Sequence, residues 1–347
     1  MQKIYFKLLG YSNKCNEMTY RYNNDYLIGD IIYLISQYLD RKSLIYFLST
    51  CRRTKQYDKI FFDKYSLYYY YIVHCSVNFK NKIKRIFNCY TNDLANFKSL
   101  TYLKFDYCFN LPIENWPNSI THLVFTSYFD QSLHHLPNSL THLTLGHTFN
   151  QQLNHLPNSI THLVLGESFN QPLNDLPNSI THLTLESRIY KHHLNSLPNS
   201  ITHLTFGFYF NQPIDNLPKS ITHLTLGHKF NQRVDHLPDS ITHLTFGYHF
   251  NQPIDNLPDS LTHLKLGMLF NQAMDKLPSS IIHLNLEEGC NLPIDNLPGS
   301  IEYLTLGKYF SYPINKLPQN LRHLKIYHKY PNIDEIRMRN RYLFIET

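Results

Sequence analysis

The sequence predicts an α+β protein in which an N-terminal head of three helices precedes a β-solenoid. The solenoid is expected to have one parallel sheet of about twelve strands and a non-helical outer wall. Proline recurs at every 20th residue from Pro117 to Pro318, apart from one gap of 21 residues. All 18 prolines lie at or after Pro112, and 20 of the 21 histidines lie at or after His122, so the N-terminal part is a different unit. A fixed period of this length is typical of stacked structural units.

The head is expected to be a small helical domain. Residues 25–65 show apolar side chains at helical spacing, with a second helix starting at Ser43 and a short third helix over 59–65. Three short helices form so small a core that such a unit usually packs against a partner. Residues 1–24 are polar and stay unassigned, and residues 66–99 are expected to form a helical connector that caps the first repeat.

Charge and cysteine content exclude several classes of protein. Residues 1–99 hold 16 Lys and Arg against 7 Asp and Glu, whereas the rest of the chain holds 16 against 19. These basic residues form no clustered stripe, so no nucleic-acid partner is expected. The chain has no apolar run of about 18 residues, so no membrane partner is expected either. The six cysteines include no Cys-x-x-Cys pair, and the N-terminus does not resemble a signal peptide, which together predict a cytoplasmic protein.

The repeats fill residues 100–326. In the unit Ile201–Ser220 the first, fourth and sixth residues are apolar and alternate with polar ones, which predicts a short strand with one buried face. About a dozen residues remain before the next strand, too few for a helix and its loops. The Leu217-Pro218 pair also disfavours helical backbone, so we expect an extended outer wall and strong curvature. Residues 327–347 are predicted to form a C-terminal cap, a helix or strand that covers the last turn.

Several repeated positions have structural explanations. Phenylalanine at the tenth position and apolar residues at the fourteenth and seventeenth are expected to fill the core. Glycine at the seventh position suits the bend that ends each strand. Asparagine at the eleventh position and serine at the twentieth are predicted to satisfy backbone groups of neighbouring turns.

The repeat resembles two known families. Its Leu-Pro pair, 20-residue period and Leu-x-x-Leu-x-Leu strand are similar to those of short leucine-rich repeats. The sequence Phe-Asn-Gln-Pro-Ile at 210–214 and at 250–254 resembles the FNIP repeat, which is named for its Phe-Asn-x-Pro core. This resemblance implies an origin in slime moulds or in giant viruses of amoebae, often with an F-box before the repeats. A viral protein of this kind would act in the cytoplasm or nucleus of the host cell.

The head in turn resembles an F-box. Tyr38-Leu39 ends the first helix, Ser43-Leu44 opens the second, and Cys51-Arg52 closes it, but Ile28 stands where the family usually has proline. The resemblance implies that the head binds a Skp-type adaptor of a cullin–RING ubiquitin ligase. The residues implied in adaptor binding are Leu27, Ile28, Ile31, Ile32, Leu39, Leu44 and Leu48.

The third residue of most strands is histidine and points to the exposed face of the sheet. Neighbouring imidazoles about 4.8 Å apart could in principle chelate a metal ion. The row contains no Cys or carboxylate, however, so a stacked aromatic row is favoured and no metal is expected. Adjacent imidazoles disfavour each other's protonation, so their pKa values are predicted to lie below about 6.5. Stability should then be lost as the pH falls from about 6.5 to about 5.

Binding residues are expected where the repeats differ. The eighth and ninth positions vary most and mix aromatic, Met and charged side chains, as protein-binding surfaces do. The candidates for target binding are Phe208, Tyr209, His228, Tyr248, Met268, Leu269, Glu288 and Lys308. The extra residue within 186–190 marks a second candidate. No nucleophile, phosphate-loop or metalloprotease motif occurs, so no catalytic residue, cofactor or enzymatic activity is expected.

These observations predict a substrate-recruiting adaptor of a Skp–cullin–F-box ubiquitin ligase, whose solenoid binds an unknown target protein and which is a monomer outside that complex. Two alternatives stay open. The first is a pure protein-interaction solenoid whose head is only a helical cap. The second is a metal- or pH-responsive protein that uses the row of histidines.

Overall fold

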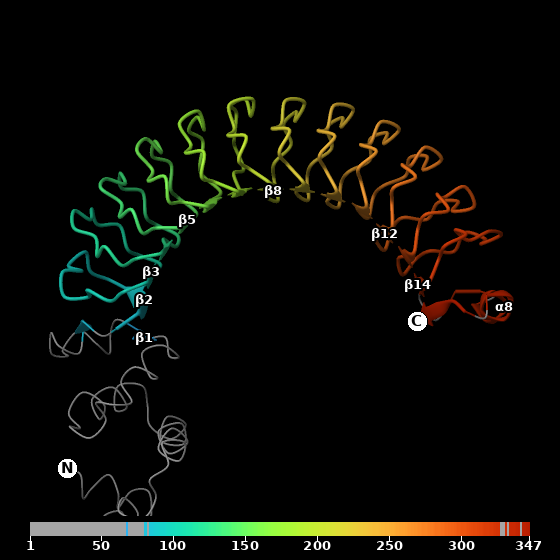
Figure 1. The fold of residues 1–347 in the computed structure, drawn as a ribbon, viewed down its shortest axis with the longest axis horizontal. Coiled ribbons are helices and arrows are strands. Elements are labelled where there is room, and N and C mark those ends of the chain that lie inside the picture. Colours follow the sequence, from blue (N-terminus) through green and yellow to red (C-terminus); the bar gives the residue numbers. More distant parts are fainter. Residues whose placement is uncertain (1–66, 69–79, 82, 327–329, 332, 341) are drawn as a thin grey trace, which may run out of the picture.

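The protein forms a curved solenoid. The computed structural model describes residues 67–68, 80–81, 83–326, 330–331, 333–340 and 342–347. In Figure 1 the strands line the inner, concave side of an arc, and the loops form its outer side. The F-box-like domain predicted for 25–65, with all its adaptor-binding candidates, lies outside the described residues, as does the segment 1–24.

The described strands belong to one parallel sheet in which each strand pairs with the next along the chain. Equivalent residues lie side by side, so that His243 pairs with His223 on one side and His263 on the other. Twelve strands, β3 to β14, fall within 100–326, as the repeat count predicted. Below, each turn is named after its strand. The strands are β1 (Leu67–Tyr68), β2 (Arg85–Cys89), β3 (Tyr102–Phe105), β4 (His122–Val124), β5 (His142–Leu145), β6 (His162–Leu165), β7 (His182–Leu185), β8 (His203–Phe206), β9 (His223–Thr225), β10 (His243–Thr245), β11 (His263–Leu266), β12 (His283–Leu286), β13 (Tyr303–Thr305), β14 (His323–Lys325) and β15 (Phe344–Glu346).

Two strands, β1 and β2, lie in the described part of 66–99, the segment for which a helical connector is predicted. Strand β2 extends the sheet beyond β3 and buries Ile86 and Cys89, with a bulge between them. Apolar residues three apart fit a helix as well as a bulged strand, and the periodicity alone could not decide between them. The open edge of β3 decides, because it offers ladder hydrogen bonds to the incoming chain.

The C-terminal segment contains a helix and a further strand. Helix α8 (Ile333–Arg339) buries Ile336 and carries acidic residues in its first turn and basic residues in its last, which suits the helix dipole. Strand β15 then pairs with β14. No helix in the described part of the chain is long and apolar enough to cross a membrane.

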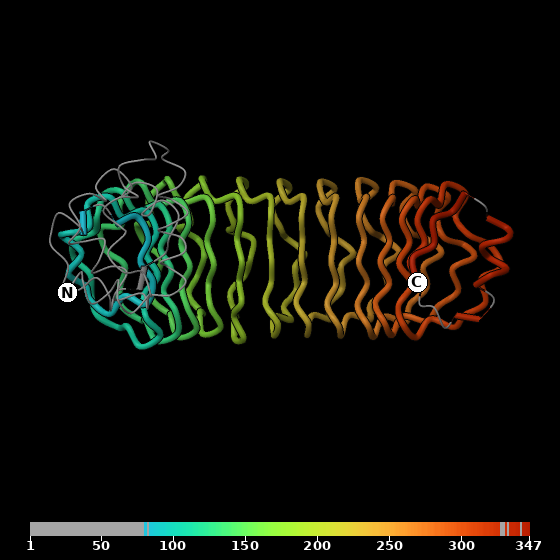
Figure 2. The backbone as a smooth tube through the Cα atoms, turned by 90° about the horizontal axis from the view of Figure 1, so that it is seen from below, coloured from blue at the N-terminus to red at the C-terminus, as the bar shows by residue number. Residues whose placement is uncertain are grey.

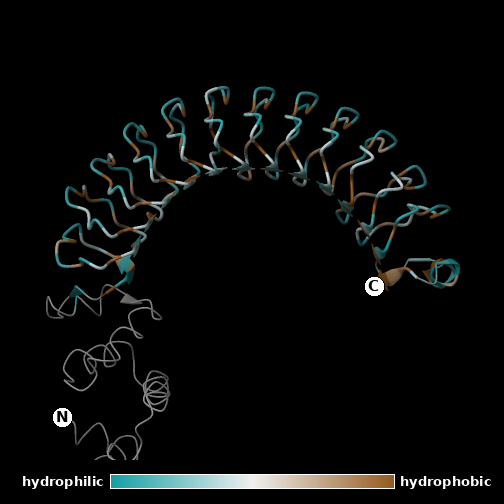
Figure 3. Ribbon diagram, viewed as in Figure 1, coloured by the Kyte–Doolittle hydropathy of each residue, from teal (hydrophilic) through white to brown (hydrophobic). Residues whose placement is uncertain are grey.

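The core lies between the sheet and the outer wall. Ile201, Leu204 and Phe206 of the β8 turn are buried, and Phe210 and Ile214 cover them from the outer side. Phe rings of successive turns stack, with 6.4 Å between the ring centroids of Phe210 and Phe230. Figure 3 shows the hydrophilic residues on the outermost loops, as expected for an outer wall that faces solvent. The predicted core positions are therefore confirmed.

Glycine at the seventh position is needed for space between turns rather than for a bend. A Cβ on Gly227 would lie 1.8 Å from the carbonyl oxygen of Gly207, and one on Gly267 would lie 1.9 Å from that of Gly247. None of the glycines at this position in the described turns has a left-handed φ. At the end of these strands the backbones of adjacent turns thus lie in direct contact, which leaves no room for a side chain.

The predicted roles of asparagine and serine are confirmed. The backbone N–H of Asn231 donates to Asn211 Oδ1 at 2.9 Å, and the side-chain Nε2 of Gln232 donates to the same oxygen at 3.1 Å. On the strand side, Ser240 Oγ donates to the carbonyl oxygen of Ile221 at 2.6 Å. All serines at this position from Ser119 to Ser300 make the equivalent bond. These bonds tie most turns to the preceding turn at both the sheet and the outer wall.

Candidate functional site

Figure 2 shows the backbone from below, towards the concave face. This face carries a continuous row of stacked rings. We call this row the histidine ladder. The ring centroids of neighbouring histidines in it lie 4.0–4.2 Å apart, which confirms the predicted stacking. The ladder consists of His122, His142, His162, His182, His203, His223, His243, His263, His283, Tyr303 and His323.

Threonines fix the orientation of most of these rings. Thr242 Oγ1 lies 2.9 Å from Nδ1 of His243 and 3.2 Å from the carbonyl oxygen of Thr222 in the preceding turn. The same arrangement precedes each ladder histidine from His122 to His263. A ring therefore cannot turn without breaking its contact with the threonine hydroxyl.

The predicted lowering of the histidine pKa values is confirmed, but its main cause differs from the one expected. Partial burial in the stack is the largest contribution, because it disfavours the charged imidazolium, and the charges of neighbouring imidazoles contribute less. In His263 these effects lower the pKa to about 4. The pKa is lowered in His122, His142, His162, His182, His223, His243, His263 and His283.

The stacking geometry does not suit a metal ion. Adjacent rings such as His223 and His243 lie within 13° of parallel, so their ring-plane lone pairs run side by side instead of converging on one point. Tetrahedral zinc requires nitrogen ligands about 2.0–2.1 Å from a common centre. Within the described residues no group of three or more His, Cys, Asp or Glu side chains is placed to hold a metal ion.

The variable eighth positions form a second row beside the ladder, which we call the rim row: Phe208, His228, Tyr248, Met268, Glu288 and Lys308. Phe208 and His228 stack with ring centroids 4.2 Å apart, and His228 and Tyr248 stack at 4.7 Å. Burial between these rings lowers the pKa of His228, with smaller effects of His249 and Lys229. The structure thus gathers three of the predicted target-binding residues into one aromatic stack.

The remaining candidates extend this surface. Tyr209 and Leu269 occupy the neighbouring ninth positions and are exposed. Met268, Glu288 and Lys308 line one hollow of about 340 Å³. A second hollow of about 280 Å³ lies against the ladder on β10 to β13 and shares Lys265, Asn285 and Thr305 with the first, so the two are adjacent. The eight candidates therefore lie along one side of turns β8 to β13.

Charge enters the concave sheet face at both ends of the sheet, with Arg85 of β2 and Lys104 of β3 at the N-terminal end. From β4 to β10 the outward residues of the strands are His, Thr and Val, whereas β11 presents Lys265, which pairs with Glu287 at 2.8 Å. At β14, Lys325 pairs with Glu346 of β15 at 2.6 Å. The two hollows thus lie where charged residues enter the C-terminal part of the sheet face.

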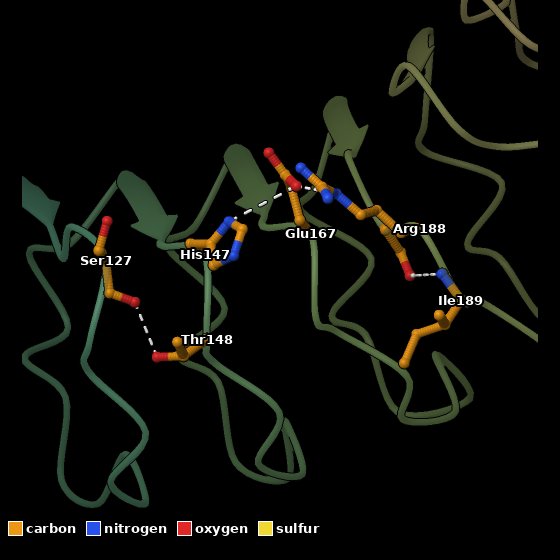
Figure 4. A network of polar contacts seen from close by, with 7 residues as sticks. Ser127, His147, Thr148, Glu167, Arg188 and Ile189 are labelled. Atoms are coloured by element: carbon orange, nitrogen blue, oxygen red, sulfur yellow. Dashed lines mark hydrogen bonds and ion pairs between the residues drawn. The ribbon is translucent and has the colours of Figure 1, made fainter.

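A polar network that the sequence analysis identified only in part adjoins the rim row (Figure 4). A carboxylate oxygen of Glu167 lies 3.5 Å from His147 Nδ1 and pairs with Nε of Arg188. The guanidinium of Arg188 lies 4.6 Å from the centroid of the Tyr209 ring. Arg188 belongs to the predicted irregular segment 186–190, but His147 and Glu167 were missed. Their signal was present, since an imidazole and a carboxylate occupy the eighth position of successive turns, and equivalent positions lie side by side in such a solenoid.

Comparison with known families identifies the repeats. The FNIP Repeat family matches nine overlapping segments: 114–148, 129–168, 149–187, 169–209, 191–229, 210–249, 230–269, 270–309 and 290–329. The chain belongs to the FNIP repeat family. All nine segments lie between residues 114 and 329, so none of them includes the F-box-like region 25–65.

One solved structure shows a similar architecture to that of this FNIP protein. The crystal structure of CroV588, a circular LRR protein of a giant virus, is 45% identical over 70% of this chain with a TM-score of 0.60. The match spans only 38% of that longer chain. A leucine-rich repeat protein from Bacteroides ovatus is 14% identical over 76% of this chain and 82% of its own, but its TM-score of 0.18 is too low for any structural argument. No curated protein sequence matches.

Proposed function

We propose that this FNIP solenoid recruits a target protein through the rim row, with Tyr209 and Leu269, and that its head links the target to a Skp-type adaptor of a cullin–RING ubiquitin ligase. The observation that carries the first half is the coincidence of variation and exposure: the residues that differ between turns form one stacked and partly apolar surface. The second half rests on the F-box-like sequence of 25–65. The chain itself makes or breaks no bond in this proposal.

The rim row has the chemistry of a protein-binding surface. Aromatic and Met side chains dominate the energetic centres of protein interfaces, and charged residues surround them. Phe208 is 48% exposed and Leu269 is 45% exposed, so both have apolar area left to bury. Stacking between Phe208, His228 and Tyr248 already restricts their rotamers. Binding a target therefore costs less side-chain entropy than ordering free side chains would.

Proximity labelling in the cell that expresses the protein tests target recruitment. We expect Phe208→Ser combined with Tyr248→Ser to remove one or a few proteins from the labelled set. Asp259→Ser, an exposed change on the outer side, should leave that set unchanged. Equal losses with both variants, or none with either, would contradict the assignment of the rim row.

A pulldown with a Skp-type adaptor tests the link to ubiquitin ligases separately. The wild-type chain should bind, and Leu39→Ala combined with Leu44→Ala should not. If the wild type fails to bind while the rim variants still lose their target, the protein is a pure interaction solenoid.

Calorimetric titration with zinc tests the metal alternative, and a trace without heat would remove it.

A further inference from the structure

From the β3 turn to the β13 turn, the outer wall is held together by a ladder of side-chain amide and carboxylate oxygens that fails at two junctions. In the regular turns, the oxygen of the eleventh-position side chain accepts from the backbone N–H of the next turn, as Asn231 does from Asn251 at 2.9 Å. This bond is missing between the β7 and β8 turns and between the β11 and β12 turns of the described chain. At the β11–β12 junction, Asn271 still carries an acceptor. At the β7–β8 junction, Lys191 occupies the eleventh position, and its ammonium group cannot accept a hydrogen bond.

Two further defects coincide at the β7–β8 junction. The β7 turn contains the one 21-residue repeat, and Tyr190 occupies the tenth position where its neighbours have Phe169 and Phe210. Tyr190 is 3% exposed, and its hydroxyl has no hydrogen-bond partner. Burial of this hydroxyl raises the pKa of Tyr190 to about 12. An unsatisfied buried hydroxyl weakens the packing of the turn that contains it.

A cavity of about 440 Å³ opens between the same two turns on the outer side. It is lined by 191–195 of the β7 turn and by 212–216 of the β8 turn. The outer wall of the β7 turn remains tied backward to the β6 turn, through Lys191 N–H to Asn170 Oδ1 at 3.0 Å and Ser196 Oγ to Asn174 Oδ1 at 2.6 Å. Among the described residues, no side-chain hydrogen bond ties it forward to the outer wall of the β8 turn.

The sheet, by contrast, continues across this junction without a break. Strands β7 and β8 pair over four residues, from His182 with His203 to Leu185 with Phe206. The rings of His182 and His203 stack at 4.1 Å, as elsewhere in the ladder. The junction is therefore intact on the concave side and untied on the outer side.

We infer that the β7–β8 junction is a hinge that divides the solenoid into two cooperative blocks, β2 to β7 and β8 to β14. In a repeat protein, stability is approximately the sum of the turns and of the interfaces between neighbours, so a weak interface separates the units that unfold together. An intact sheet with an untied outer wall lets the curvature change at this place. The Glu167–Arg188 pair lies on the N-terminal side of the hinge, and the rim row lies on the C-terminal side. Arg188 contacts Tyr209, a neighbour of the rim row, across the hinge.

Hydrogen exchange in increasing urea, followed by mass spectrometry on the full chain, measures the two blocks separately. We expect peptides from β4 to β6 and from β9 to β12 to open at urea midpoints that differ by about 0.5 M or more. The fluorescence of Trp116, the single tryptophan, should follow the first block, because its ring packs against Phe105 and Phe125. Coincident midpoints in the wild type would overturn the inference.

Three variants isolate the cause. Lys191→Asn supplies the missing acceptor for the β8 turn and should reduce the gap between the two midpoints by about half or more. Lys191→Ala removes the same charge without supplying an acceptor and should leave the gap unchanged. Asn251→Lys, which removes the acceptor of Asn271 N–H and Gln272 Nε2, should create a new division after the β10 turn. Equal effects of Lys191→Asn and Lys191→Ala, or no division with Asn251→Lys, would also overturn the inference. None of these results depends on the proposed function.

Discussion

The histidine ladder and the rim row run side by side along the concave surface, but they differ in composition and in partners. The ladder repeats one residue, and a threonine hydroxyl fixes most of its rings, as at His243. The rim row changes from Phe208 to Lys308 and makes few polar contacts within the chain. The repeated residues thus make contacts that hold neighbouring turns together, whereas the variable side chains remain available to a partner.

The largest expected difference lies between a buried and a rim phenylalanine. Phe230 is 0% exposed and stacks between Phe210 and Phe250, so Phe230→Ala should lower the free energy of unfolding by about 3–5 kcal/mol. Phe208→Ala should change it by less than about 1 kcal/mol, because that ring is already half exposed. Urea denaturation measures both. Similar losses in the two variants would show that the rim row is part of the core.

Acid should weaken the ladder more than the rim row, in which His228 is the one histidine with a lowered pKa. Because the pKa of eight ladder histidines is lowered by folding, the unfolded chain binds more protons than the folded chain below about pH 6.5, the usual histidine pKa. Stability is therefore fully present above about pH 6.5 and lost as the pH falls towards about 5, which calorimetric melting temperatures will show. Replacing His223, His243 and His263 by Gln should flatten this dependence. A melting temperature that stays constant from about pH 7.5 to about pH 5 would contradict it.

Gly227 and Gly299 differ in whether the neighbouring turn leaves room for a side chain. A Cβ on Gly227 would overlap the Gly207 carbonyl oxygen, so Gly227→Ala should destabilise the fold by about 1–3 kcal/mol. A Cβ on Gly299 would find its nearest atom at 3.7 Å, an ordinary contact. Gly299→Ala should therefore be neutral or stabilise by up to about 1 kcal/mol. Thermal denaturation of the two variants decides, and equal effects would reject the spacing argument.

The smallest expected effect concerns Tyr190. Removing its unsatisfied hydroxyl in Tyr190→Phe should stabilise the β7 turn by about 1 kcal/mol, since the ring keeps its packing and the core loses an unpaired polar group. Hydrogen exchange of peptides around 180–200 measures this directly. Phe210→Tyr, which adds such a hydroxyl one turn later, should have the opposite sign. A destabilised Tyr190→Phe would mean that the hydroxyl has a partner.

The sequence predicted the parts of the fold that follow from periodicity. Alternation at Ile201, Leu204 and Phe206 identified the strand and its buried face, and the short return path excluded outer helices. It failed at β2, where no repeat unit guides the assignment and a bulge shifts the register. It also explained the glycines wrongly, because contact between turns depends on how closely the backbones stack, which a single repeat does not reveal.

The sequence predicted which positions belong to the candidate site, but it did not predict the hollows between their side chains. Variation pointed to Phe208, His228 and Tyr248, and their stacking follows from the common register of the turns. The hollows around Lys265 and Asn285 depend on side-chain sizes in three neighbouring turns at once. The cavity at the β7–β8 junction similarly depends on the path of an irregular segment, which composition does not determine.

The most direct test of the account compares the rim row with the ladder as binding surfaces. Once proximity labelling has identified a target, calorimetry measures its Kd for the wild type, for Phe208→Ser with Tyr248→Ser, and for His223→Gln with His243→Gln. We predict a loss of at least about tenfold in affinity, or about 1.4 kcal/mol, for the rim variant and less than about threefold for the ladder variant. A ladder variant that loses the target while the rim variant retains it would contradict the account.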